Sequence, residues 1–402
     1  MKGKAFSNIP MSSPDITELE IRAVTNGLYR GRLSIGPQVE AFEKAIANYV
    51  GLKYAIGVSS GTAGLHLAVI AADVADKDLV ITTPFSFIAS ANVILYERAI
   101  PIFVDVDPKT GNINPELISE AITDINGGHK KTNRWLPPVL RVSQSSKTLM
   151  NIKAILPVHA YGRPADIDPI RAIANQFNIN VIEDACEAIG SEYKNRKVGT
   201  LGNCGVFAFY PNKQITTGEG GMIVTDDDAL NSLFRSLRNQ GRDIIDAWLN
   251  HSRLGYNYRL DEMSAALGAI QMSRIEELLT KREKVASLYN ARLKDVKGIE
   301  IPYIAPSTTR MSWFVYVVRL NSKISRSRVM KELEARGIPS RPYFSPIHLQ
   351  PFYIEKFGYK RGDFPVTEYL GDVSLALPFS GVMREDQVDY VCLNLIEILQ
   401  KT

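Results

Sequence analysis

Between about residues 54 and 225, short apolar runs alternate with amphipathic stretches. Repeated strand, crossover and strand units of this kind predict a mostly parallel sheet that is covered by helices. The runs that we predict as strands are YAIGV from Tyr54, LVITT from Leu79, PIFVDV from Pro101, AILPV from Ala154, NVIED from Asn180, Val206 to Phe209, and GMIVT from Gly221. The pattern predicts an α/β major domain over residues 11–250, with its chemistry just beyond the carboxyl ends of the strands.

The pattern changes after about residue 250, where it predicts a smaller α+β domain over residues 251–402. The predicted elements are a long charged helix from Asp261 to about Leu293, the strand WFVYVVRL from Trp313, and a helix near Arg326 to Arg336. A chain of 402 residues is also too long for one compact core, so two domains are expected.

Composition narrows the class of protein. Hydrophobic residues make up 45% of the chain and charged residues 22%, which are ordinary values for a globular protein. Cys186, Cys204 and Cys392 are too scattered for a disulfide framework or a zinc site, so we expect a reducing, cytoplasmic location and no metal. No apolar run is long enough to span a bilayer, and a net charge of +4 gives no reason to expect nucleic acid as a partner.

Residues 127–153 stand apart from this organisation. They carry no acidic residue and the basic residues Lys130, Lys131, Arg134, Arg141, Lys147 and Lys153. We interpret the segment as an insertion between a helix and a strand. A solvated surface loop is the favoured reading, and a role in gripping an anionic substrate is the alternative.

A first candidate site follows the strand at Tyr54, which runs into the turn SSGTAGLHL. Unpaired N–H groups and the helix dipole attract anions at the start of a helix, so Gly61, Thr62 and Ala63 are candidates for binding a phosphate. A strand-to-helix turn is often only a turn, and this one matches neither GxGxxG nor GxxxxGK[ST].

Two further signals fall at the same predicted edge of the sheet. Asp184 ends the strand NVIED, although a plain helix N-cap is the alternative. Lys213 lies in a turn rich in threonine and glycine, where partial removal from water would make it a usable nucleophile; a solvated turn lysine is the alternative. A phosphate cradle, a carboxylate and a lysine together match the groups that hold pyridoxal phosphate.

With these residues in place, the sequence resembles the DegT/DnrJ/EryC1/StrS family of sugar aminotransferases. The matching motifs, in chain order, are GLYRGRLSIGPQVEAFE, SSGTAGLHL, TTPFSFIASANVI, VHAYGRPADID, EDACEAIG, FYPNKQITTGEGGMI, LGYNYRLDEMSAALG and PIHLQPFY. The resemblance implies the fold of aspartate aminotransferase and the cofactor pyridoxal phosphate. It also implies transfer of an amino group from an amino acid, expected to be glutamate, to a keto sugar, expected to be linked to a nucleotide diphosphate.

The resemblance implies roles for individual residues. Lys213 would form the Schiff base with the cofactor, Asp184 would hold the pyridine nitrogen, and Phe87 would stack on the ring. The turn after the first strand, with Thr62 and Ala63, would hold the phosphate. Asn257 would reach the phosphate of the neighbouring subunit, which implies a homodimer with shared active sites; a helix-capping asparagine is the alternative.

Two positions depart from the family pattern. The family often has serine five residues before the lysine and glutamine or histidine three residues after the aspartate, whereas this chain has Ala208 and Glu187. Ala208 removes one possible phosphate ligand. A charged Glu187 beside the ring oxygen of the cofactor would disfavour its phenolate form, unless Glu187 is protonated, paired with a base or turned away.

Substrate-binding residues are predicted less directly. Tyr210, Tyr343 and His348 are candidates to border the sugar site, with a core or interface position as the alternative for His348. The basic candidates for a pyrophosphate are Arg238, Arg242, Arg259 and the residues of the insertion. We expect His159, after the strand AILPV, to pack near the cofactor or to cap a loop.

Other functions stay open at this point. Some relatives are sugar dehydratases, which replace the lysine by histidine, so Lys213 argues against dehydration. Relatives that make cyclitol amines or an aminated aromatic acid are not excluded, and neither is a cofactor-binding regulator without turnover. A nicotinamide oxidoreductase is disfavoured because no strand is followed by GxGxxG with an acidic residue about 20 positions further on.

Overall fold

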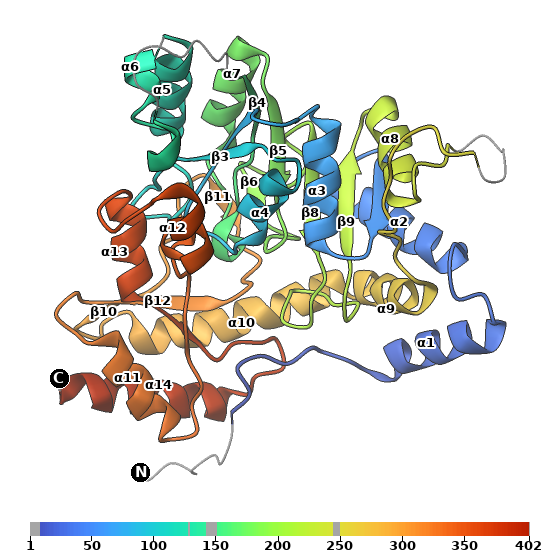
Figure 1. The fold of residues 1–402 in the computed structure, drawn as a ribbon. Coiled ribbons are helices and arrows are strands. Elements are labelled where there is room, and N and C mark those ends of the chain that lie inside the picture. Colours follow the sequence, from blue (N-terminus) through green and yellow to red (C-terminus); the bar gives the residue numbers. More distant parts are fainter. Residues whose placement is uncertain (1–8, 128, 142–150, 244–249, 402) are drawn as a thin grey trace.

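A computed structural model of the chain describes residues 9–127, 129–141, 151–243 and 250–401. Its main feature is a seven-stranded sheet in the order β1-β9-β8-β5-β4-β2-β3 (Figure 1). The strands are β1 (Tyr54–Val58), β2 (Leu79–Thr82), β3 (Ile100–Phe103), β4 (Ile152–Ile155), β5 (Asn180–Asp184), β8 (Cys204–Ala208) and β9 (Gly221–Thr225). Only β9 runs antiparallel to its neighbours, so the predicted strands and the mostly parallel α/β sheet are confirmed.

The two faces of the sheet follow from the alternation of side chains along each strand. Leu79 and Ile81 of β2 belong to the hydrophobic cluster on one face, and Val80 between them belongs to the cluster on the other face. Helices α2 (Pro37–Val50), α5 (Pro115–Asn126) and α7 (Ile167–Phe177) cover the first face, and α3 (Gly61–Ala71), α4 (Ala89–Tyr96) and α8 (Asp228–Arg238) cover the second. Burial of one such aliphatic side chain contributes about 1.5–3 kcal/mol, so packing on both faces stabilises the sheet.

A second, antiparallel sheet lies in the C-terminal part of the chain. Its strands, in spatial order, are β10 (Ile299–Glu300), β12 (Tyr316–Leu320), β14 (Ser374–Leu377) and β13 (Arg341–Pro342), with α11 (Arg326–Glu334) and α14 (Glu385–Gln400) packed beside them. The predicted strand after Trp313 and the helix near Arg326 are thereby confirmed.

Shorter elements complete the fold. The strands β6 (Glu192–Tyr193), β7 (Arg196–Lys197) and β11 (Thr308–Arg310) form a three-stranded sheet. Apart from the two helices that follow Asp261, the remaining helices are α1 (Glu18–Arg30), α6 (His129–Thr132), α12 (Pro351–Phe357), α13 (Pro365–Val373) and the 3₁₀ turns η1 (Pro138–Leu140), η2 (Ala160–Gly162) and η3 (Ile347–Leu349). Within the described ranges, no helix combines the length and the apolar character needed to cross a membrane.

The prediction of one long helix after Asp261 was wrong, because two helices occupy this stretch. α9 (Glu262–Ser273) and α10 (Ile275–Leu293) meet at Arg274, whose φ of −109° and ψ of 8° break the helix. Arg274 is buried and donates hydrogen bonds to Asp15 (2.9 Å) and Glu20 (2.7 Å) of the N-terminal segment. These tertiary ion pairs hold the break, and a local helical pattern cannot reveal them.

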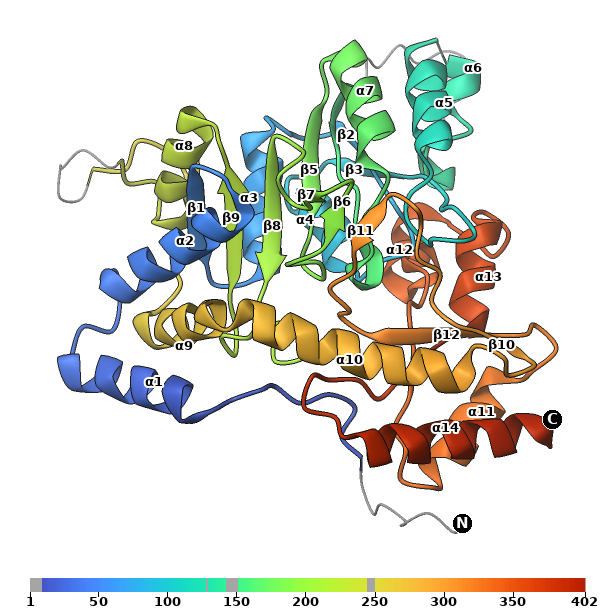
Figure 2. The ribbon, with the colours of Figure 1, turned by 180° about the vertical axis from the view of Figure 1, so that it is seen from behind.

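Helix α10 connects the two cores of the molecule. Leu278 and Leu279 pack in the cluster of the large sheet, whereas Val285 and Tyr289 pack in the cluster of the small sheet. Figure 2 shows α10 running between the large sheet and α14. The domain boundary near residue 250 stays a prediction, because α9 beyond that boundary packs against α1 and α2.

The basic insertion is only partly within the described residues, since 142–150 lie outside them. In the described part, Arg134 pairs with Glu120 (3.0 Å) and covers the ring of Trp135 at 4.5 Å. Lys153, at the start of β4, pairs with Asp73 (2.9 Å). Trp135 and Leu136, however, are buried in the hydrophobic cluster of the large sheet, so the described part of the insertion is anchored to the core and carries Arg134 at its surface.

Gly205 of β8 lies at a tightly packed position of the large sheet. A Cβ atom at Gly205 would lie 2.1 Å from Gly199 O, so we expect Gly205→Val to force a backbone shift that costs at least about 2 kcal/mol of folding free energy. Gly27 of α1 has no atom within 4 Å of such a Cβ, so Gly27→Ala should stabilise the protein by about 0.5–1 kcal/mol. Thermal unfolding midpoints of the two variants would check the contrast, and equal midpoints would contradict it.

Candidate active site

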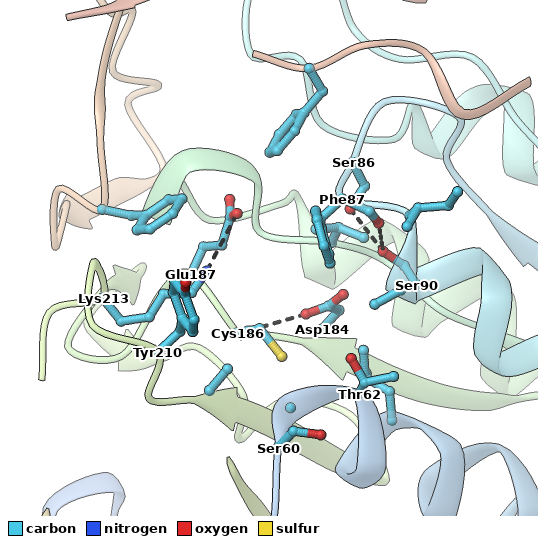
Figure 3. A pocket seen from close by; sticks show the side chains of 18 of the residues that line it. Ser60, Thr62, Ser86, Phe87, Ser90, Asp184, Cys186, Glu187, Tyr210 and Lys213 are labelled. Atoms are coloured by element: carbon cyan, nitrogen blue, oxygen red, sulfur yellow. Dashed lines mark hydrogen bonds and ion pairs between the residues drawn. The ribbon is translucent and has the colours of Figure 1, made fainter. Parts of the chain in front are cut away.

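A cavity of about 770 Å³ lies at the carboxyl edge of the large sheet (Figure 3). Its walls come from the ends of β5 and β8, from the segments after β1 and β2, and from the turn before β9. Phe314 and Tyr343, from the C-terminal part of the chain, complete the wall. The cavity thus occupies the position at which parallel sheets place their ligands.

The turn between β1 and α3 is shaped by Gly61. A Cβ atom at this residue would lie 2.7 Å from Ala208 Cβ and 2.8 Å from Cys186 Sγ, so a larger residue would displace the walls of the cavity. The glycine therefore keeps the start of α3 accessible from the cavity. The dipole of α3 and the backbone N–H groups of its first turn fit a phosphate group there.

The residues next to Gly61 differ in their access to the cavity. Thr62 lines it, as does Ser60. Ala63 is buried behind them, and its N–H donates to Ser60 Oγ (3.0 Å), which caps the helix. Of the three residues predicted to bind phosphate, Gly61 and Thr62 therefore face the cavity, and the Ala63 N–H group already has a partner.

Asp184 ends β5 at the centre of the cavity (Figure 3). It is buried, and its Oδ1 accepts a hydrogen bond from Cys186 N (3.1 Å). No basic residue in the described ranges forms an ion pair with Asp184, so the carboxylate has capacity for a protonated ring nitrogen. Phe87 stands beside Asp184 with 64% of its surface exposed, which leaves an aromatic face for a planar ligand.

Lys213 reaches the cavity from the turn that follows β8. Its Nζ lies 3.6 Å from Glu187 Oε1 and 3.9 Å from the centre of the Phe314 ring. The lysine side chain is only 12% exposed. A nearly buried amine therefore faces the same cavity as Asp184 and the glycine turn, and it can react with a bound carbonyl group.

Glu187 is the second carboxylate of the site. Its Oε2 accepts a hydrogen bond from Tyr161 N (2.9 Å), and Tyr161 adopts a φ of 65°, which is uncommon outside glycine. Burial raises the pKa of Glu187, and the nearby Lys213 acts in the opposite direction. The unusual glutamate is thus buried and paired with a base, which is one of the arrangements in which it would be compatible with the cofactor.

Of the other predicted site residues, some line the cavity and others lie outside it. Tyr210 and Tyr343 line the cavity. His348 lies outside it, fully buried, with its Nε2 3.0 Å from Glu368 Oε1, which is the core position considered as the alternative. Asn257 is exposed and does not line the cavity of its own chain.

The remaining polar candidates have structural partners. His159 is fully buried and caps a loop, because its Nδ1 accepts a hydrogen bond from Ala165 N (2.9 Å) while Nε2 faces Glu183 (3.0 Å). Arg238 is held by Glu43 at 2.5 Å. The other two arginines predicted to meet a pyrophosphate contact polar side chains, Arg242 at Gln240 (3.3 Å) and Arg259 at Asn239 (3.0 Å). The described walls of the cavity include none of these arginines.

Three residues around Lys213 were not predicted from the sequence: Gln214, Arg282 and Phe314. Gln214 Nε2 donates to the main-chain oxygen of Glu187 (2.6 Å), and Arg282 donates to the main-chain oxygen of Lys213. Only Gln214 has a local signal in the sequence, because it directly follows the lysine. Arg282 and Phe314 come from segments far away in the sequence.

The seven-stranded sheet, the glycine turn, Asp184 and Lys213 together define a pyridoxal-phosphate-dependent enzyme with the fold of aspartate aminotransferase. The chain belongs to the DegT/DnrJ/EryC1/StrS aminotransferase family, whose sequence profile matches residues 14–396. The resemblance seen in the motifs is thereby confirmed, and so are the class of enzyme and its cofactor.

Individual relatives are similar to this chain over most of their length. A GDP-perosamine synthase of Caulobacter vibrioides is 38% identical over 91% of each chain. A protein of Geobacillus stearothermophilus named pleiotropic regulatory protein is 34% identical over 97% of this chain and 98% of its own. The crystal structure of a DegT/DnrJ/EryC1/StrS aminotransferase from Brucella abortus superposes with a TM-score of 0.82, at 30% identity over 94% of each chain.

The raised pKa of Glu187 predicts a specific pH dependence of stability in the cofactor-free protein. The folded state holds the proton of Glu187 more tightly than the unfolded chain, so stability falls as the pH rises above the ordinary value of 4.5. Glutamine does not titrate, so the stability of Glu187→Gln should not fall in this way. Its free energy of unfolding should therefore increase relative to that of the unsubstituted protein as the pH rises above 4.5. Urea midpoints between pH 2 and pH 8 would measure the difference.

Glu277 provides a control of opposite sign. The hydrogen bond from Arg274 lowers the pKa of Glu277 to about 2, so its contribution to stability appears as the pH rises from about 2 to 4.5. Glu277→Gln should therefore lose stability relative to the unsubstituted protein in that range. Identical pH profiles for Glu187→Gln and the unsubstituted protein would contradict the assignment for Glu187.

Proposed function

We propose that this aminotransferase moves an amino group from glutamate to a keto sugar that is linked to a nucleotide diphosphate. The observation that carries the proposal is the position of Lys213 Nζ, 3.6 Å from Glu187 and in one cavity with Asp184 and Gly61. The identity of the acceptor is supported by the GDP-perosamine synthase of Caulobacter vibrioides, which is similar to this chain over nearly its full length.

The residues of the cavity fit pyridoxal phosphate. The start of α3, at Gly61 and Thr62, would bind the phosphate through N–H groups and the threonine hydroxyl. Asp184 would accept a hydrogen bond from the pyridine nitrogen and keep it protonated, and Phe87 would cover one face of the ring. Pyridoxal phosphate, when bound, would supply an aldehyde carbon that takes up the amino group and a ring that delocalises electrons.

Lys213 would serve as the proton carrier of the reaction. Its Nζ would take a proton from the α-carbon of the amino-acid donor and later return a proton to the carbon that becomes aminated. Glu187, in contact with Nζ, would stabilise the ammonium form between these events. Tyr210 and Tyr343, at the wall of the cavity, would border the sugar.

The site also needs groups from a second subunit. Both proposed substrates are anions, yet Lys213 is the sole basic residue in the described walls of the cavity. Asn257 is exposed and lies outside its own cavity. Two large apolar side chains of the surface, Tyr29 (86%) and Leu254 (82%), are largely exposed, which is typical of an interface. We therefore propose a homodimer in which Asn257 of one subunit reaches the cavity of the other.

The role of Lys213 can be tested by spectroscopy. Glutamate should convert the absorption band of the protein loaded with pyridoxal phosphate to that of the pyridoxamine form, and this conversion should be absent in Lys213→Ala. Turnover of the variant should fall by more than roughly 10⁴-fold, because both the covalent anchor and the proton carrier are lost. Lys44→Ala, at an exposed position of α2, is the control. A Lys213→Ala variant with normal turnover would refute the assignment.

A mixture of two inactive variants tests the shared site. Lys213→Ala and Asn257→Ala are each expected to have low activity. After exchange of subunits at equal amounts, half of the dimers would be mixed and would carry one intact site, so activity should recover to about a quarter of the unsubstituted level. If Asn257 serves its own chain, the mixed dimer has no intact site and no activity returns.

A further inference from the structure

Arg282 stands out among the buried charges that the proposed reaction does not use. It lies in the middle of α10 and is only 3% exposed. The hydrogen bonds found for it in the described structure all go to main-chain carbonyl oxygens, and none goes to a carboxylate. A guanidinium group removed from water usually needs a carboxylate, because an unpaired buried charge is costly. Arg274, at the start of the same helix, has such partners in Asp15 and Glu20.

The carbonyl groups that Arg282 binds belong to two segments of the chain. Its Nη1 donates to Trp313 O (3.1 Å) and Phe314 O (3.2 Å), in the segment that leads into β12. Its Nη2 donates to Asn212 O (3.2 Å) and to Lys213 O, in the turn that follows β8. One side chain therefore ties the lysine turn of the large sheet to the segment that leads into the small sheet.

Both segments determine where the amine of Lys213 lies. Lys213 N donates to Tyr210 O (2.9 Å), so Arg282 fixes the second end of the same residue. The Phe314 ring lies 3.9 Å from Lys213 Nζ. Trp313, next to Phe314, has a φ of 53°, a strained conformation that the surrounding contacts must maintain.

Only an arginine can make this set of contacts. Burial lowers the pKa of Arg282 to about 10, which leaves the guanidinium charged at neutral pH. Its planar fork offers five N–H donors, enough for the carbonyl groups of both segments. A lysine has three donors on one atom, so it would leave at least one buried carbonyl group without a partner.

We propose that Arg282 is a positioning residue for Lys213. By binding carbonyl groups of both segments, its guanidinium holds the amine of Lys213 between Glu187 and the Phe314 ring, in reach of the cofactor aldehyde. The inference rests on the proposed role of Lys213 and adds the group that sets its geometry.

The test measures where pyridoxal phosphate attaches to the protein. The unsubstituted protein, Arg282→Met, Arg282→Lys and Arg292→Met are incubated with pyridoxal phosphate and reduced with borohydride, and the label on each lysine is quantified by mass spectrometry. Arg292 lies on the same helix but pairs with Glu385 (2.7 Å) on α14, so Arg292→Met is the matched control. Circular dichroism establishes that each variant is folded.

We expect the labelling rate of Lys213 to fall by roughly 10- to 100-fold in Arg282→Met, because a small misplacement of the amine is enough for such a loss. Arg282→Lys should restore part of the rate and shift the pH dependence of the bound cofactor spectrum. Arg292→Met and the labelling of the exposed Lys44 should match the unsubstituted protein.

The outcomes separate this inference from the proposed function. Labelling of Lys213 at the normal rate in folded Arg282→Met would overturn the inference alone. If Arg282→Met does not fold, the labelling rate of Lys213 in the folded Arg282→Lys variant decides. A slowed rate supports the inference, and a normal rate overturns it. Absence of label on Lys213 in the unsubstituted protein would overturn the proposed function, and the inference with it.

Discussion

The parallel pairing of β5 with β8 is the constraint on which the site depends. In this register Asp184 lies opposite Val206, so β5 ends two residues before Ala208 ends β8. The carboxylate is therefore fixed at the sheet edge, while the neighbouring strand continues into the turn that carries Lys213. A shift of one residue would turn Asp184 to the opposite face, because side chains alternate along a strand. The geometry of the reaction thus begins with main-chain hydrogen bonds inside the sheet.

Close packing at the sheet edge explains how the site tolerates its departures from the family pattern. Ala208 lies against the glycine turn, where even a Cβ atom on Gly61 would approach it to 2.7 Å. The site lacks a hydroxyl group there and retains the N–H groups at the start of α3, which are the proposed phosphate ligands. Glu187 is compensated differently, because Lys213 and the N–H group of Tyr161 both contact its carboxylate. Neighbouring groups therefore compensate for both Ala208 and Glu187.

The sequence predicted what local patterns determine. Each strand of the large sheet carries its own apolar run, and Asp184 and Lys213 follow such runs directly, so their convergence could be expected before the structure was known. The break at Arg274 and the burial of His348 could not be read in this way. Both depend on carboxylates from elsewhere in the chain, namely Glu20 and Glu368. Sequence patterns predict which face a residue occupies, but they do not show which distant residue will meet it.

Helix α10 joins the two parts of the chain that line the cavity. The large sheet supplies Asp184, Lys213 and the glycine turn, whereas Phe314 and Tyr343 of the C-terminal part close the opposite wall. Because α10 is packed into both cores and Arg282 binds main-chain atoms on each side, their spacing is set by backbone geometry. Side chains of this wall other than Phe314, which contacts the amine, can then vary without moving the lysine.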